Sequence, residues 1–208
     1  MKKFELISEF VTNVFGKKLF RIKALVSFGD VSAGELGGFV EKEENLSNNG
    51  NAWVAGNARV AGDARVSGDA LVSGNAQVSD NAWVSGNARV SGNAWVSGDA
   101  LVAGNAWVSG DAQVSGNAWV SGDAQVAGDA DFSVVTGFGR CFRATTFFRC
   151  KDKILRVQCG CFYGDLAKFR EIVKKTHGDS KYAKEYLAIA DLMELHFSDE
   201  EENQEADK

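Results

Sequence analysis

The cysteines and histidines of this 208-residue chain, its most versatile nucleophiles and metal ligands, all lie in the C-terminal third. All four cysteines fall between Cys141 and Cys161, and the two histidines are His177 and His196. A reactive thiol needs a lowered pKa and access to solvent, and structural zinc generally uses two separated pairs of ligands. Cys159 and Cys161 offer one pair alone. We therefore expect no metal and no cofactor, and we assign no catalytic residue.

Arginines in the same stretch favour binding over catalysis. Residues 140–150 and 154–163 are predicted as two strands joined at residues 152–153, with Lys151 opposite Ile154. In this register one face is apolar, and on the other face Arg149 lies opposite Arg156. Like charges in that position are destabilising, so a bound anion would relieve them. Arginines beside aromatic rings suit phosphates and bases. The predicted anionic-ligand surface is Arg143, Arg149, Arg156, Phe147 and Phe162.

The alternatives for this surface are a solvated face or an acidic protein partner. Two helices are predicted to follow it, the first capped by Asp165 and ended by Gly178, the second capped by Ser180. Residues 132–197 hold twelve Lys and Arg against seven Asp and Glu, so this module is basic. Residues 198–208 form a run of charges that is predicted to be a disordered acidic tail.

A long repeat must position this module. From residue 50 to 130 a six-residue unit such as Gly-Asn-Ala-Trp-Val-Ala recurs, with Val at every sixth position from Val54 to Val126. A fixed short period is the signature of a solenoid. Because residues two apart in an extended segment share a face, Ala and Val point into the core. Gly with Asn or Asp forms the corner, since Gly tolerates positive φ. Only Asp80 interrupts the Gly series.

The inward Val and the small inward Ala resemble the hexapeptide-repeat family, the left-handed parallel β-helix. The resemblance implies three hexads in each triangular coil, so residues eighteen apart stack in neighbouring coils. The predicted fold is therefore mainly β. Its parts are an N-terminal cap (1–49), a left-handed parallel β-helix (50–131), and a small α+β module of a β-hairpin plus two helices (132–197), before the acidic tail (198–208).

The stacking rule predicts an apolar ladder on the third face of the solenoid, formed by Trp83, Leu101 and Trp119. Exposed apolar stripes usually mark an interface, and proteins of the family are commonly trimers packed through their coils. We therefore predict that the chain is a homotrimer with this ladder in its interface. The alternative is that surface tryptophans merely stack on each other.

Two flanking segments carry a narrower resemblance. The stretch RIKALVSFGDVSAGELGGFVEKEENLS resembles the opening of bacterial and prophage hexapeptide-repeat proteins of undefined function. The stretch CGCFYGDLAKFREIVKKTHGDSKYAKEYLAIADLMELHF resembles a C-terminal module found behind repeat arrays in bacterial and phage proteins. This resemblance implies an accessory role in a phage or prophage.

The expected function is that of a non-enzymatic oligomeric binding protein in the bacterial cytoplasm. It would serve as a phage or prophage accessory or counter-defence protein that sequesters a small anionic, nucleotide-like ligand or blocks a host protein. No run approaches the roughly 18 apolar residues of a membrane span, and no membrane or nucleic-acid partner is expected. One alternative is an acyl-CoA-dependent acyltransferase-like enzyme, although the repeat holds no histidine to serve as base. Another is a structural spacer or oligomerisation stalk.

Overall fold

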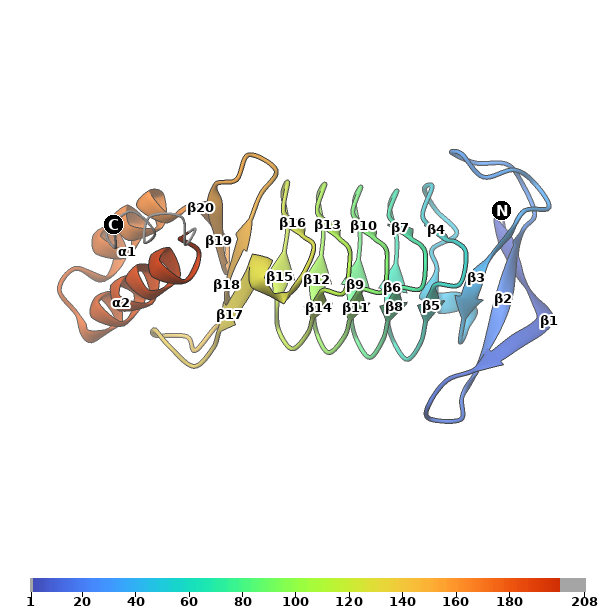
Figure 1. The fold of residues 1–208 in the computed structure, drawn as a ribbon, viewed down its shortest axis with the longest axis horizontal. Helices are drawn as coiled ribbons and strands as arrows, with labels where there is room; N and C mark the ends of the chain where they lie inside the picture. Colours follow the sequence, from blue (N-terminus) through green and yellow to red (C-terminus); the bar gives the residue numbers. More distant parts are fainter. Residues whose placement is uncertain (1, 199–208) are drawn as a thin grey trace, which may run out of the picture.

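The computed structural model describes residues 2–198, so the predicted tail lies outside the described residues except for Ser198. A solenoid forms the middle of an elongated molecule, with a three-stranded cap at one end and a sheet and two helices at the other (Figure 1). The predicted fold, a mainly β protein with a solenoid and a terminal module of strands and helices, is confirmed. None of the helices in residues 2–198 is long and apolar enough to cross a membrane.

Thirteen two-residue strands, β4 to β16, build the coils. They are β4 (Trp53–Val54), β5 (Arg59–Val60), β6 (Arg65–Val66), β7 (Leu71–Val72), β8 (Gln77–Val78), β9 (Trp83–Val84), β10 (Arg89–Val90), β11 (Trp95–Val96), β12 (Leu101–Val102), β13 (Trp107–Val108), β14 (Gln113–Val114), β15 (Trp119–Val120) and β16 (Gln125–Val126).

The coils stack as the repeat predicts. Every third strand pairs in parallel, so Val54 lies beside Val72 and Val72 beside Val90, eighteen residues apart. Three faces result, with strand orders β4-β7-β10-β13-β16, β5-β8-β11-β14 and β6-β9-β12-β15. The inward Val and Ala side chains are buried. Corner glycines from Gly50 to Gly122 have φ between 60° and 72°, and Asp80 takes the same conformation at 60°.

Most backbone hydrogen bonds between coils run toward the coil that follows, and those outside the strand pairs all do so. The N–H of Arg59 donates to the carbonyl of Ala76 at 2.9 Å, and the N–H of Ala61 donates to the carbonyl of Val78 at 2.9 Å. In these bonds each coil donates to the coil that follows it. The first coil is left with carbonyl oxygens that have no earlier coil to pair with, and the last coil is left with N–H groups.

The N-terminal cap supplies donors for the free carbonyl oxygens. Its strands β1 (Phe4–Thr12), β2 (Lys18–Ala24) and β3 (Leu36–Val40) extend the second face. The Lys3 Nζ donates to the carbonyls of Gly50 at 3.3 Å and Ala52 at 2.9 Å. After β3 the short helix η1 (Glu43–Asn45) ends in the fully buried Asn45.

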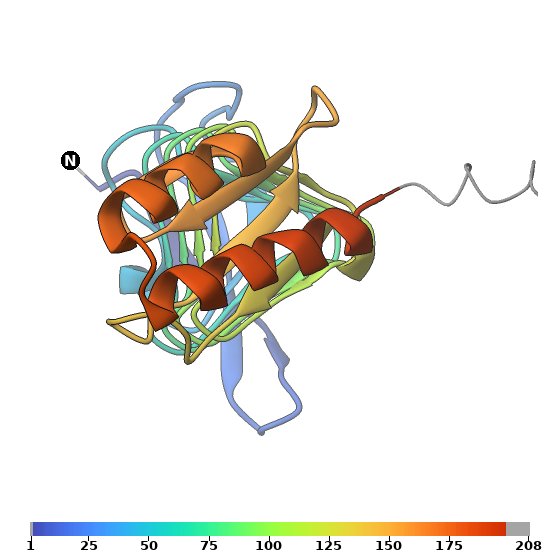
Figure 2. The same cartoon turned by 90° about the vertical axis from the view of Figure 1, so that its left-hand side faces the viewer.

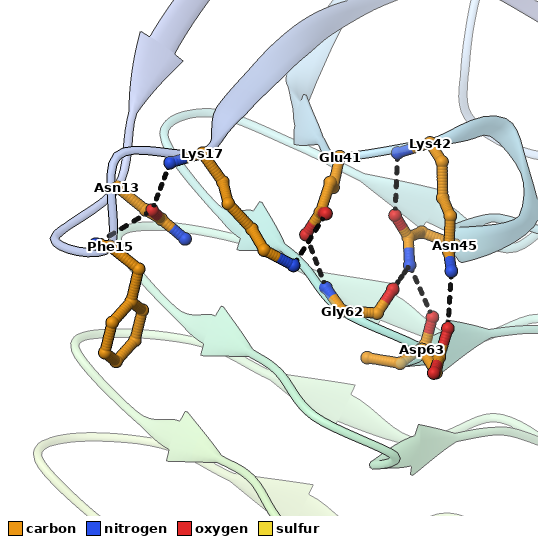
Figure 3. Close-up of polar contacts among 9 residues, drawn as sticks. Asn13, Phe15, Lys17, Glu41, Lys42, Asn45, Gly62 and Asp63 are labelled. Atoms are coloured by element: carbon orange, nitrogen blue, oxygen red, sulfur yellow. Dashed lines mark hydrogen bonds and ion pairs between the residues drawn. The ribbon is translucent and has the colours of Figure 1, made fainter.

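Asn45 does at a second corner what Lys3 does at the first. Its Nδ2 donates to the carbonyls of Gly62 at 3.0 Å and Ala64 at 2.8 Å, and its Oδ1 accepts the N–H of Lys42 at 2.9 Å (Figure 3). The hairpin of β1 and β2 is held at the same corner, because Lys17 forms an ion pair with Glu41 at 2.9 Å and Glu41 accepts the N–H of Gly62 at 2.7 Å (Figure 3).

An antiparallel sheet closes the C-terminal end, in the order β17 (Phe132–Val135), β18 (Thr145–Arg149), β19 (Leu155–Cys159) and β20 (Phe162–Asp165), after the short helix η2 (Asp129–Asp131). Helices α1 (Leu166–His177) and α2 (Lys181–His196) cover its far side (Figure 2). The predicted caps are confirmed, since Asp165 accepts the N–H of Lys168 and Ser180 accepts that of Ala183.

The register predicted for the hairpin in this sheet is wrong by one residue. Arg149 pairs with Leu155, and Phe148 pairs with Arg156. The connection is a three-residue loop, residues 151–153, in which Lys153 has φ of 61°. Loops of this length often end in a left-handed residue, and the extra residue flips each side chain of one strand relative to its partner. The predicted second strand is also divided at Gly160, and β17 adds a strand that was not predicted.

Asn45→Ala is expected to lower the free energy of unfolding by about 2 to 3 kcal/mol, because it leaves two buried carbonyl oxygens and one N–H without partners. Equilibrium denaturation in urea measures the change. Asn75→Ala is the matched control, since this exposed corner amide donates only to Asn93 at 3.2 Å. The control should change stability by less than about 0.5 kcal/mol. Equal losses in the two variants would contradict the capping role of Asn45.

The burial of Lys3 predicts that the free energy of unfolding depends on pH. Burial lowers the pKa of Lys3 from 10.5 to about 8, although the charge of Asp69 acts in the opposite direction. Between pH 8 and pH 10.5, Lys3 is protonated to a greater extent in the unfolded chain than in the folded protein, so the free energy of unfolding rises with pH. From pH 8 to pH 10 we expect this rise to be about 1 to 2 kcal/mol larger in the wild type than in Lys3→Met. Parallel pH profiles from urea titrations would refute the lowered pKa.

Candidate ligand-binding groove

The predicted anionic-ligand surface on the C-terminal sheet is not formed as one face. Phe147 is fully buried on the helix side of the sheet and meets Phe169 edge to face, with ring centroids 6.1 Å apart. Phe162 packs against the same ring at 5.5 Å. Both phenylalanines therefore belong to the core between the sheet and the helices.

The three arginines of that prediction point to different places. The Arg149 Nη2 donates to the carbonyl of Phe197 at 2.9 Å, on the helix side. Arg156 lies opposite Phe148 in the strand register, and Phe148 belongs to the solenoid core. The Arg156 guanidinium forms an ion pair with Asp152 at 2.6 Å. Arg143 is exposed and precedes β18. The one-residue change of register separates Arg149 from Arg156, so no anion is needed between them.

Two groups beside the sheet, the Cys150 thiol and the Tyr186 hydroxyl, are held in their neutral forms. Burial raises the pKa of the Cys150 thiol, which lies with Tyr163 and Arg156 around a cavity of about 280 Å³. Burial and the neighbouring Cys159 raise the pKa of Tyr186 to about 12. A thiol with a raised pKa is a poor nucleophile. These groups are suited to packing and hydrogen bonding.

The third face has the stacking that the sequence predicts. Leu101 lies between Trp83 and Trp119 in the ladder of β9, β12 and β15. Trp83 is 50% exposed and Trp119 is 37% exposed. The participation of this ladder in an interface between subunits stays a prediction.

Serines of the preceding coil fix three of the tryptophans, and these contacts were not predicted from the sequence. The indole Nε1 of Trp83 donates to the Ser67 hydroxyl at 2.9 Å, and the Nε1 of Trp107 donates to Ser91 at 3.2 Å. Trp95 does the same with Ser79 at 3.4 Å. A serine sixteen residues before each tryptophan is the signal in the sequence. Since the polar atom of each ring already has a partner, the ring that remains exposed is apolar.

A groove of about 760 Å³ runs along the first face. Its floor is the outward row Trp53, Leu71, Arg89, Trp107 and Gln125, and one wall is the corner row Asn51, Asp69, Asn87, Asn105 and Asp123. Residues 29–31 border the groove at the N-terminal end and Lys151 at the other end. The two loops that hold these residues extend beyond the same edge of the coils (Figure 1).

Hydrogen bonds between neighbouring coils order the wall. The Asn87 Nδ2 donates to the Asn105 Oδ1 at 3.1 Å, and the Asn105 Nδ2 donates to the Asp123 Oδ1 at 3.1 Å. Each amide has two N–H donors and a carbonyl oxygen with two lone pairs. The groove therefore presents a row of donors and acceptors that repeats once per coil, about every 4.8 Å.

Charges along the groove are mixed. Arg89 and Lys151 are its cations, and Asp30, Asp69 and Asp123 are its carboxylates. This balance favours neither a polyanion nor a polycation. The sequence predicted the outward row of the first face but not the groove, because its ends come from loops that are far from the repeat in the sequence.

Comparison with known proteins bears on the repeat alone. The family described as the YdcK beta solenoid repeat matches residues 64–80, 76–92, 82–98 and 112–128. A comparison with curated proteins gave no match. The matched residues lie within the coils from β6 to β16. The family matches and the stacked coils agree that the chain is a β-solenoid repeat protein.

Proposed function

We propose that the protein is a non-enzymatic binding protein of the bacterial cytoplasm that self-associates as a homotrimer and captures a ligand or partner along its coils. The observation that carries the proposal is the third-face ladder of Trp83, Leu101 and Trp119. On the other faces Arg89 or the glutamines interrupt the row of large apolar side chains. A continuous exposed apolar stripe is the feature that most often marks an interface.

The wider role that we propose is that of a phage or prophage accessory or counter-defence protein. The resemblance of residues 21–47 and 159–197 to segments of bacterial, prophage and phage repeat proteins supports it. Such a role needs a stable surface for capture more than a reaction centre. A small anionic ligand has support only from Arg89 and Lys151 in the groove, and the three carboxylates there outweigh them.

Substitution of the ladder tests self-association. The wild-type chain is expected to be a trimer. The double variant Trp83→Gln with Leu101→Gln is expected to be monomeric, because a trimer would have to bury two amides in its interface, and their desolvation is unfavourable. Native mass spectrometry and sedimentation velocity of the full chain at tens of micromolar measure the state. Circular dichroism shows whether the variant keeps its fold.

Trp95→Gln is the matched control. Trp95 lies on the second face and makes the same kind of indole-to-serine hydrogen bond as Trp83. The control should remain a trimer. A monomeric wild type would sink the proposal, and so would a folded double variant with the same mass distribution as the wild type.

A further inference from the structure

We infer that the groove on the first face binds a linear, uncharged oligosaccharide. The inference names the ligand class for the binding function proposed above, but it uses a different face from the trimer interface. It rests on four properties of the groove. The backbone N–H groups are already bonded, the ring of Trp107 is exposed, one wall is polar, and loop residues border both ends.

The backbone N–H groups along the middle of this face are already bonded to the next coil. The N–H of Leu71 donates to Ala88, that of Arg89 donates to Ala106, and that of Trp107 donates to Ala124, at 2.8 to 3.0 Å. A peptide that binds by strand addition needs a free sheet edge, and the groove lies across a face. Recognition there must use side chains, and this disfavours an extended peptide.

Trp107 provides an apolar platform. It is 46% exposed, while Trp53 at the N-terminal end is only 3% exposed and packs edge to face against Phe28. The bond from the Trp107 Nε1 to Ser91 holds the indole across the preceding coil. An aromatic ring fixed in this way offers its π surface to the C–H face of a pyranose ring, and its bound N–H no longer requires solvent.

The wall of Asn87, Asn105 and Asp123 complements the hydroxyl groups of such a ligand. These side chains already share hydrogen bonds at 3.1 Å, and each amide keeps further donor and acceptor capacity. The spacing of the row, about 4.8 Å per coil, is similar to the length of one sugar unit in a chain. A repeating polyhydroxylated ligand can therefore meet equivalent groups from coil to coil.

The ends of the groove limit the length of the ligand. From the coil of Trp53 to the coil of Gln125 there are four coil spacings, about 19 Å. Asp30 borders the groove at one end and Lys151 at the other. Affinity should therefore rise with chain length and then become constant once the ligand spans the groove. The mixed charges favour an uncharged chain over an anionic one.

Isothermal titration calorimetry of the full-length protein tests the inference. The probes are neutral linear oligomers of β-1,4-glucose, α-1,4-glucose and β-1,4-N-acetylglucosamine, from disaccharide to hexasaccharide. We expect at least one series to bind, with affinity increasing from disaccharide to hexasaccharide. Trp107→Ala should weaken binding by about tenfold or more, since an aromatic contact of about 1.4 kcal/mol corresponds to that factor.

Trp95→Ala is the control, because it removes an equivalent tryptophan from another face and should leave the affinity unchanged. Failure of all three series to bind at millimolar concentration would overturn the inference. Equal binding by Trp107→Ala and the wild type would also overturn it. Sedimentation of the same samples keeps the result separate from self-association, since Trp107→Ala should remain a trimer whether or not the sugar binds.

Discussion

The polarity of the coil-to-coil hydrogen bonds, most of which point toward the C-terminus, is the constraint on which the rest of the structure depends. They leave acceptors at one end of the solenoid and donors at the other, and an unpaired buried group costs about 1 to 3 kcal/mol. Lys3 and Asn45 meet this demand with donors. At the opposite end Thr146 accepts the N–H of Trp119, and the carboxylate of Asp131 accepts that of Ala127. The two caps therefore have opposite chemistry and cannot be exchanged.

The same bonds also mean that each face of the solenoid must contact a ligand or partner through its side chains. Since the backbone is occupied along the axis, the outward residue of each hexad is what distinguishes one face from another. Tryptophans recur every twelve residues from Trp83 to Trp119, which is two hexads, so successive ones fall on different faces. On the third face Leu101 lies between two tryptophans, whereas on the first face Arg89 lies beside Trp107 and a polar wall borders the row. One repeat thus yields a surface suited to packing and another suited to a hydrated ligand.

Sequence patterns predicted the features that the period of the repeat controls. The position of Val54 fixes the inward residues and the ladder of Trp83, because one register error would expose the whole core. The caps of the two helices are equally local. The roles of Lys3 and Asn45 could not be predicted, since they depend on which carbonyl oxygens lack partners in three dimensions. The predicted arginine surface is not formed, because a loop one residue longer than expected changed the register of β18 and β19. The sheet is also covered on both sides, by the coils and by the helices.

Burial of both sides of that sheet ties the ends of the groove to the core. Phe148 and Cys150 belong to the same core as the coils, while Phe147 belongs to the core under the helices. The loop that carries Lys151 therefore has a fixed position relative to the first face. The loop with Asp30 is fixed in the same way, because Phe28 packs on Trp53. The distance between these loops is set by the number of coils, so insertion of a whole coil would lengthen the groove while leaving each cap and its hydrogen bonds unchanged.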